Sequence, residues 1–222
     1  MNSVCLVQFA KLPELGRVKT RMQPFLSEIE SLMLHKQLMW HTLTEFTKVT
    51  AADYELWFDK DWTKKSNQDD FLKRISQQKI AVNVQKGQDL GAKMAECFSR
   101  RLLDFVCVII IGSDCPYLNQ SIIQSVVEAL EDNDCVIVPA MDGGYALIAL
   151  KKTDDQLFTD IQWGSSGVLA ATEVVLKRLN FQYVCFKALG DIDEAEDLRL
   201  LAKTSIGRQL LSPNLLEKSL SK

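Results

Sequence analysis

The sequence has little of what disulfide frameworks, zinc sites and Cys–His catalytic pairs require. Its six cysteines contain no Cys-x-x-Cys pair, and most stand inside apolar runs such as 106–108. This pattern is typical of reduced, buried thiols. The two histidines, His35 and His41, fall in one predicted helix, so Cys115 has no evident histidine partner, and we interpret both histidines as structural.

Long hydrophobic runs, a basic leader and an excess of positive charge are also missing. The longest apolar run, around 106–111, is far shorter than the roughly 18 residues of a membrane helix. The N-terminus does not begin with a basic region and a signal-length apolar stretch, which predicts a cytoplasmic protein. A net charge of -3 gives no overall attraction to nucleic acid or anionic lipid, so neither partner is expected.

What the sequence does contain is the pattern of one large α/β domain. It has 222 residues, of which 47% are hydrophobic and 25% are charged. Strand-like and helical segments alternate, which predicts a mostly parallel sheet covered on both faces, a three-layer α/β/α sandwich. We assign 1–205 to this domain and 206–222 to a C-terminal helical tail. The predicted strands are 4–9, 54–58, 80–84, 106–111, 135–139, 145–150 and 182–186, and the predicted helices are 28–48, 71–76, 91–103, 120–131, 166–179 and 194–201.

Three local patterns support these elements. Ser27 and Glu30 form a capping box before a helix whose apolar residues, Ile29, Met33 and Leu43 among them, recur at helical spacing. The run 106–111 is apolar on both faces and predicts a central buried strand. Only a tight turn separates the strands 135–139 and 145–150, which predicts an antiparallel pair.

The first candidate site is the segment after the first strand, where 11–21 holds four cations in eleven residues. Arginine and lysine donate to phosphate oxygens, and Gly16 allows a close backbone approach. The alternative is a solvated basic loop. The segment is not a P-loop, because no glycine directly precedes Lys19.

The second candidate is Asp114, which follows the central strand and stands two residues before Pro116. Ligands bind outside the carboxyl ends of strands in open α/β sheets, and a carboxylate there suits Mg²⁺ or Mn²⁺. The alternative is a turn or helix-capping aspartate. Asp191 and Asp193 precede a late helix and are free to face a ligand, whereas the acids of the first helical turn are explained by the helix dipole.

Five ordered motifs carry a family resemblance over about residues 4 to 200. They are FAKLPELGRVKTR, QKGQDLGAKM, IIIGSDCPYL, VPAMDGGYALIAL and DIDEAEDL. The chain resembles a bacterial family of glycosyltransferases often labelled radical-SAM/selenodomain-associated or arsenosugar-biosynthesis transferases. It is more distantly similar to phospholactate and molybdenum-cofactor guanylyltransferases. The resemblance implies the nucleotide-diphosphosugar transferase (GT-A, Rossmann-like) fold.

The resemblance also implies roles for residues that match the motifs. The phosphates would be held by Lys11, Arg17, Lys19 and Arg21, and the base by Gln85 and Gly87. Asp114 and Asp193 would be the ligands of Mg²⁺ or Mn²⁺. The transferred or accepting group would meet Asp142, Gly143, Gly144, Tyr145 and Trp163, with Asp142 as a catalytic base beside Asp114.

Two positions depart from the family pattern. Gly164, Ser165 and Ser166 follow Trp163 where Trp-Ser-Thr is expected, and Ala146 replaces a commonly aromatic residue. Both departures bear on the acceptor more than on the nucleotide.

The expected activity is metal-dependent glycosyl transfer from a nucleotide sugar to a small-molecule acceptor. Two alternatives stay open. In nucleotidyl transfer, an acceptor attacks the α-phosphorus of a nucleoside triphosphate and pyrophosphate leaves. In the second alternative, the chain binds a nucleotide but catalyses no transfer, and the departures near Trp163 would fit this alternative.

Overall fold

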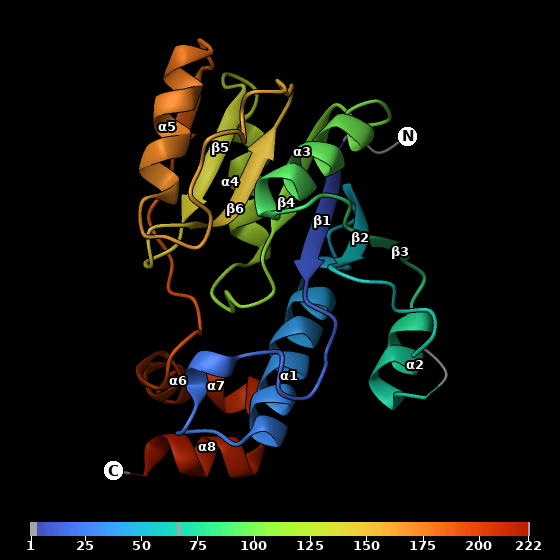
Figure 1. Ribbon diagram of the computed structural model, residues 1–222, viewed down its shortest axis with the longest axis vertical. Coiled ribbons are helices and arrows are strands. Elements are labelled where there is room, and N and C mark those ends of the chain that lie inside the picture. The colour runs from blue at the N-terminus through green and yellow to red at the C-terminus, as the bar shows by residue number, and fades with distance from the viewer. Residues whose placement is uncertain (1–3, 66–67, 222) are drawn as a thin grey trace.

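The computed structural model describes residues 4–65 and 68–221, and these residues form one twisted sheet covered by helices (Figure 1). The sheet has seven strands in the order β3-β2-β1-β4-β6-β5-β7. They are β1 (Val4–Ala10), β2 (Ala52–Phe58), β3 (Ala81–Val84), β4 (Cys107–Ile111), β5 (Cys135–Pro139), β6 (Tyr145–Leu150) and β7 (Tyr183–Cys185). The predicted α/β fold class is confirmed.

The sheet is parallel except at β6. That strand runs antiparallel to β4 and to β5, its two neighbours. The tight turn between β5 and β6 therefore makes a hairpin, as the sequence predicts. All strands except β6 point their carboxyl ends to the same edge of the sheet, and β6 begins at that edge.

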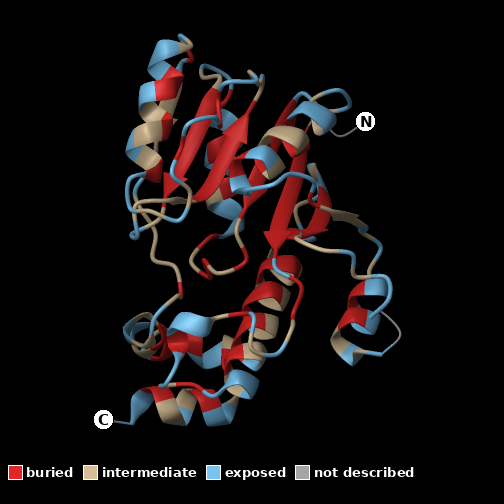
Figure 2. Ribbon diagram, in the orientation of Figure 1, coloured by how far each residue is buried: buried red, intermediate tan, exposed pale blue. Residues whose placement is uncertain are grey.

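The helices lie on two faces. Side chains of α1 (Glu28–Phe46), α2 (Asp70–Ser76) and α4 (Gln120–Ala129) pack into one core cluster, and those of α3 (Leu90–Arg101) and α5 (Val168–Arg178) pack into the other. Each strand of the sheet's centre contributes to both clusters on alternate residues, because successive side chains of a strand point to opposite faces. Figure 2 shows the sheet buried between these layers.

A third core cluster lies around the part of α1 that extends past the sheet. There α1 meets α6 (Ala195–Ala202), α7 (Ser205–Leu210) and α8 (Pro213–Leu220), seen at the bottom of Figure 1. Leu34 and Leu38 of α1 are buried against this group, with Leu215 of α8. Lys218 also pairs with Glu30 at 2.7 Å, so α8 is tied to the start of α1.

The start of α1 has the predicted capping box. Ser27 Oγ accepts from the Glu30 amide at 3.3 Å, and Glu30 Oε2 accepts from the Ser27 amide at 2.7 Å. These bonds satisfy amides that the helix itself leaves unpaired. In the part of the chain that the structure describes, no helix combines the length and the apolar character needed to cross a bilayer.

Candidate functional site

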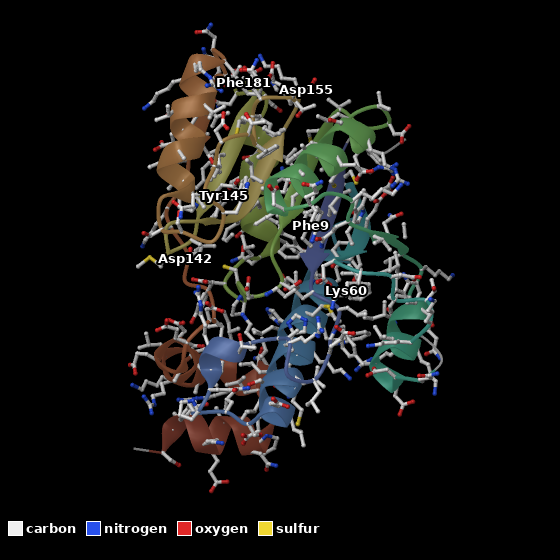
Figure 3. The ribbon with its side chains drawn as sticks, viewed as in Figure 1. Phe9, Lys60, Asp142, Tyr145, Asp155 and Phe181 are labelled. Atoms are coloured by element: carbon white, nitrogen blue, oxygen red, sulfur yellow. The ribbon has the colours of Figure 1, made fainter. Side chains whose placement is uncertain are left out.

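A cavity of about 490 Å³ lies at the edge where the parallel strands end and β6 begins. This is the position where open α/β sheets bind ligands. Figure 3 labels Phe9 near the end of β1, and Asp142 and Tyr145 at the hairpin between β5 and β6. The cavity is lined by nine of the residues to which the family resemblance gives a role: Lys11, Lys19, Gln85, Asp114, Asp142, Gly144, Tyr145, Trp163 and Asp193.

An ion-pair cluster occupies the part of the cavity beyond β4. Lys19 Nζ lies 3.1 Å from Asp114 Oδ2 and 3.8 Å from Asp193 Oδ1. The Lys19 side chain is 6% exposed, so its ammonium is held between the two carboxylates and largely away from water. Burial raises the pKa of Asp114, but the charge and hydrogen bond of Lys19 outweigh burial and hold that pKa below its usual range.

Arg17 and Arg21 lie outside the cavity lining, on the exposed side of the loop after β1. Arg21 Nη1 contacts Asp193 Oδ2 at 2.7 Å, so Arg21 borders the ion-pair cluster, and this hydrogen bond and charge raise the arginine pKa. Arg17 points elsewhere and lies 3.8 Å from Glu14. The structure therefore brings Lys19 and Arg21 to the same carboxylate and leaves Arg17 apart.

The local backbone explains how Lys19 and Asp193 reach Asp114. Lys19 has φ 50° and ψ 40°, a left-handed conformation that is uncommon for a side-chain-bearing residue and costs roughly 1–3 kcal/mol. On the other side, the Ile192 amide donates to the Asp114 carbonyl at 2.9 Å. This bond attaches the loop after β7 to the end of β4, so residues far apart in sequence share one site.

A buried hydrogen-bond network joins β1 to the segment that directly follows β4. Gln8 Nε2, in the middle of the sheet, donates to Ser113 Oγ at 2.8 Å and to the Met39 carbonyl at 3.2 Å. Ser113 Oγ donates in turn to the Phe9 carbonyl at 2.8 Å. The Tyr54 hydroxyl donates to Gln8 Oε1. Because buried polar groups are costly to leave unpaired, this network holds the residue before Asp114 in one position.

Asp191 adds a further carboxylate to the cavity lining. Burial, together with the negative charges of Asp142 and Asp114, raises the pKa of Asp191 to about 6. The sequence marks Asp191 as free to face a ligand, but the family motif gives it no role. Within residues 4–65 and 68–221, no group of three or more His, Cys, Asp or Glu side chains is arranged to hold a metal ion.

The hairpin glycines serve the packing of α5 as well as the cavity. Asp142 Oδ1 accepts from the Gly144 amide at 2.9 Å, which shapes the turn. Gly143 has φ 91°, and a Cβ there would lie 2.1 Å from the Ser166 carbonyl oxygen. Gly143 is not part of the cavity lining, and its absent side chain allows the segment before α5 to lie against the hairpin.

Trp163 closes the side of the cavity next to β6. Its ring meets that of Tyr145 edge-on, with centroids 6.4 Å apart. A Cβ on Gly91, at the start of α3, would lie 2.5 Å from Trp163 Nε1, so the glycine makes room for the indole. Trp163, which directly precedes the departing residues 164–166, thus contributes an aromatic wall, and Ala146 beside Tyr145 is buried.

At the opposite end, the cavity is lined by residues after β1, β2 and β3. Gln85 follows β3 directly and is buried, whereas Gly87 lies outside the lining, and a Cβ there would meet the Lys93 amide nitrogen at 2.6 Å. Sequence reasoning missed Asp59 and Lys93, which line this end. Asp59 directly follows β2, so the rule that sites lie after strands would have found it.

The histidine and cysteine at the cavity have structural surroundings. His35 Nε2 lies 2.9 Å from the Lys11 carbonyl, which can only accept, so this nitrogen carries the proton. Burial lowers the pKa of His35 to about 4. Cys115 Sγ lies 3.2 Å from the Gly190 carbonyl, and burial raises its pKa to about 12. A thiol held in this way is a poor nucleophile.

The fold is similar to those of several solved structures. One is a protein of Desulfovibrio desulfuricans G20 provisionally assigned as a nucleotide-diphospho-sugar transferase, with 26% identity, a TM-score of 0.87, and 98% of this chain and 95% of that chain covered. A CMP-2-keto-3-deoxy-manno-octonic acid synthetase in complex with CTP has 10% identity and a TM-score of 0.55, with 90% and 96% covered. The 4-diphosphocytidyl-2C-methyl-D-erythritol synthase of Anaerococcus prevotii DSM 20548 has 13% identity and a TM-score of 0.54, with 87% and 94% covered.

These likenesses show the fold of the nucleotide-diphospho-sugar transferases. No curated protein matches the sequence. A family model described as an uncharacterized protein conserved in bacteria (DUF2064) matches residues 42–165, which include β4, the hairpin and Trp163. Since this match spans more than half of the chain, the chain belongs to the DUF2064 family.

Proposed function

We propose that this chain is a transferase that takes a glycosyl group from a nucleotide sugar and passes it to a small-molecule acceptor. The observation that carries the proposal is the ion-pair cluster in the cavity. Lys19 lies between Asp114 and Asp193 at the carboxyl edge of a sheet whose fold is shared with nucleotide-diphospho-sugar transferases. Cations for a diphosphate and carboxylates for a divalent cation thus stand side by side.

Lys19 and Arg21 are the phosphate-binding groups in this proposal, with Lys11 at the cavity. Arg17 lies beside Glu14 and would have to turn from it to join them. In the free protein Lys19 and Arg21 are paired with Asp114 and Asp193. A diphosphate offers these cations stronger partners, because its oxygens carry more charge than one carboxylate. Binding therefore exchanges carboxylate partners for phosphate partners.

Asp114 and Asp193 are the proposed ligands of Mg²⁺ or Mn²⁺. Both carboxylates contact the same lysine ammonium, so both face one cation position. Mg²⁺ commonly takes one or two protein carboxylates and completes its shell with water and substrate phosphate oxygens, and this donor pair fits such a site. When bound, the ion would supply positive charge that stabilises the departing diphosphate.

The hairpin and Trp163 form the proposed site of the transferred or accepting group. The acceptor hydroxyl oxygen bonds to the anomeric carbon, and the bond from that carbon to the diphosphate oxygen breaks with its electron pair on the diphosphate. Asp142 takes the hydroxyl proton in this proposal. Gly143 and Gly144 shape the turn, and Tyr145 and Trp163 provide aromatic surface for a sugar ring.

Calorimetric titration with a panel of nucleotide sugars and nucleoside triphosphates, each with and without Mn²⁺, tests the proposal. We expect metal-dependent binding of a nucleotide sugar, followed by release of nucleoside diphosphate in the presence of acceptors. In Asp114→Asn the metal-dependent affinity should fall at least tenfold, about 1.4 kcal/mol. Asp132→Asn removes a carboxylate that does not line the cavity and is the matched control. A folded Asp114→Asn protein with unchanged affinity would remove the metal assignment.

Nucleotidyl transfer is the second candidate, and the number of cations around the first loop favours it. Lys11 and Lys19 line the cavity and Arg21 borders it, which offers cations for the additional phosphate of a nucleoside triphosphate. A preference for a nucleoside triphosphate, with release of pyrophosphate, would establish this reaction instead. Binding without any product across the panel would indicate a nucleotide-binding protein.

The cellular site of this activity is proposed to be the cytoplasm. The observation behind it is that all six cysteines are free thiols and five of them are buried, as expected for a reducing compartment.

A further inference from the structure

The end of the cavity beyond β1, β2 and β3 presents two hydrogen-bond acceptors that receive no donor from residues 4–65 and 68–221. One belongs to Gln85 and the other to Asp59, and both residues line the cavity. Phe9 and Leu90 line the same cavity and provide apolar surface, with the Phe9 ring stacked on Trp57. An apolar pocket with a few placed polar atoms is the usual form of a site for a flat heterocycle.

The orientation of the Gln85 amide follows from its partners. Its side-chain nitrogen donates to the Trp57 carbonyl at 2.7 Å and to the Ala10 carbonyl at 3.4 Å. Carbonyl oxygens only accept, so the nitrogen and not the oxygen must face them, and both of its hydrogens are engaged. Among the described residues, no donor contacts Gln85 Oε1, which is left as an acceptor.

Asp59 is fixed beside Gln85 in a similar way. Its Oδ1 accepts from the Leu12 amide at 2.6 Å, and its own backbone amide donates to the Ala10 carbonyl at 3.0 Å. The Gln85 side chain donates to that same carbonyl oxygen, so the Asp59 backbone amide and the Gln85 side chain converge on one atom. Within the described chain no hydrogen bond reaches Asp59 Oδ2, the second free acceptor.

We propose that Gln85 and Asp59 select a nucleotide whose base presents two neighbouring N–H groups. Among the common bases this is guanine, with a ring N–H next to an exocyclic amino group. Adenine and cytosine present an amino group beside an unprotonated ring nitrogen, and uracil presents one N–H between two carbonyls. For these bases an acceptor faces an acceptor, which leaves a buried polar atom unpaired. The inference rests on the proposed function and names the donor's base.

The proposed selection of guanine can be tested by varying the ligand while the protein stays unchanged. Calorimetric titration in Mn²⁺ compares the 5′-diphosphates of guanosine, inosine, adenosine, cytidine and uridine. Inosine differs from guanosine by the exocyclic amino group alone. We expect guanosine diphosphate to bind at least tenfold more tightly than inosine diphosphate and than each of the others.

The outcomes separate the two proposals. Binding of all five diphosphates with similar affinity overturns the base assignment and leaves the transferase proposal standing. A tenfold preference for uridine, adenosine or cytidine diphosphate also overturns the base assignment and leaves the transferase proposal standing. Failure of every diphosphate to bind overturns both.

The variant Asp59→Asn replaces one of the two hydrogen-bond acceptors by a donor. The Leu12 amide still needs an oxygen, so the asparagine amide turns its nitrogen toward the base. We expect the preference for guanosine over inosine diphosphate to fall to within about threefold, while the affinity for inorganic pyrophosphate stays the same. Asp61→Asn makes the same chemical change outside the cavity lining and should keep the full preference. An unchanged preference in a folded Asp59→Asn protein would overturn the role of Asp59.

Discussion

Replacing Lys19 by methionine should move the affinities for divalent cation and for nucleotide in opposite directions. In the free protein the Lys19 ammonium lies 3.1 Å from Asp114 and 3.8 Å from Asp193, so it occupies the position proposed above for a divalent cation. The same ammonium is the proposed partner of the diphosphate. Lys19→Met keeps an unbranched side chain, one atom shorter, and removes the ammonium with its charge and its hydrogen bond to Asp114.

The magnitude follows from the ion-pair distance. At 3.1 Å and an effective dielectric constant of about 20, the gross attraction between Lys19 and Asp114 is about 5 kcal/mol. Desolvation offsets much of it, because the lysine side chain is only 6% exposed. A net effect of about 1.4–2.8 kcal/mol corresponds to a factor of about 10 to 100 in affinity. We expect Mn²⁺ to bind more tightly, and diphosphates more weakly, by a factor in this range.

Two titrations measure the effect. Electron paramagnetic resonance follows free Mn²⁺ without nucleotide, and calorimetry compares a nucleoside with its diphosphate. Lys60→Met is the control, because it removes a lysine charge outside the cavity lining, where Lys60 pairs with Glu14. Equal losses of nucleoside and diphosphate affinity, or unchanged Mn²⁺ binding in a folded Lys19→Met protein, would refute the reasoning.

Two further predictions concern stability. Gly143→Ala places a Cβ 2.1 Å from the Ser166 carbonyl and should destabilise the protein by more than about 2 kcal/mol. Gly164→Ala, at φ 80° with open space around it, should cost only about 1 kcal/mol, so thermal unfolding should separate the pair and equal melting temperatures would contradict the packing argument. Separately, the hydrogen bonds of Lys218 and Ser27 lower the pKa of Glu30 from 4.5 to about 2. This contribution to stability is present above pH 4.5 and is lost as the pH falls toward 2, so Lys218→Met should destabilise the protein at pH 7 by up to about 1 kcal/mol and much less at pH 2.5. An equal destabilisation at both pH values in urea titrations would rule out the ion pair as its cause.

The helices and strands could be predicted because their signals are local. The strands β5 and β6 have the predicted bounds, and their antiparallel pairing follows from a turn too short for a crossover. The capping box at Ser27 likewise depends on residues three positions apart. Such patterns need no knowledge of the rest of the chain.

The sequence pattern did not predict which face of α1 is buried. Ile29 and Met33, part of the apolar pattern that predicts the helix, are 64% and 39% exposed. Leu34 and Leu38 are buried instead, because the C-terminal helices α6 and α8 cover that side of α1. The partner of a helix face is set by distant parts of the chain, so periodicity predicts the helix without its orientation.

The candidate site likewise has features that local sequence patterns predict and contacts that depend on distant parts of the chain. The sequence by itself determined that Asp114 follows a buried strand, that cations follow the first strand, and that parallel strand ends share one edge. Only the tertiary structure decided that Lys19 lies between Asp114 and Asp193, and that Gln85 and Asp59 converge on the Ala10 carbonyl. The reason is that a residue's place in the fold follows from local pattern and topology. Contacts at hydrogen-bond distance depend instead on loop conformations, such as the left-handed backbone of Lys19, which packing against distant residues selects.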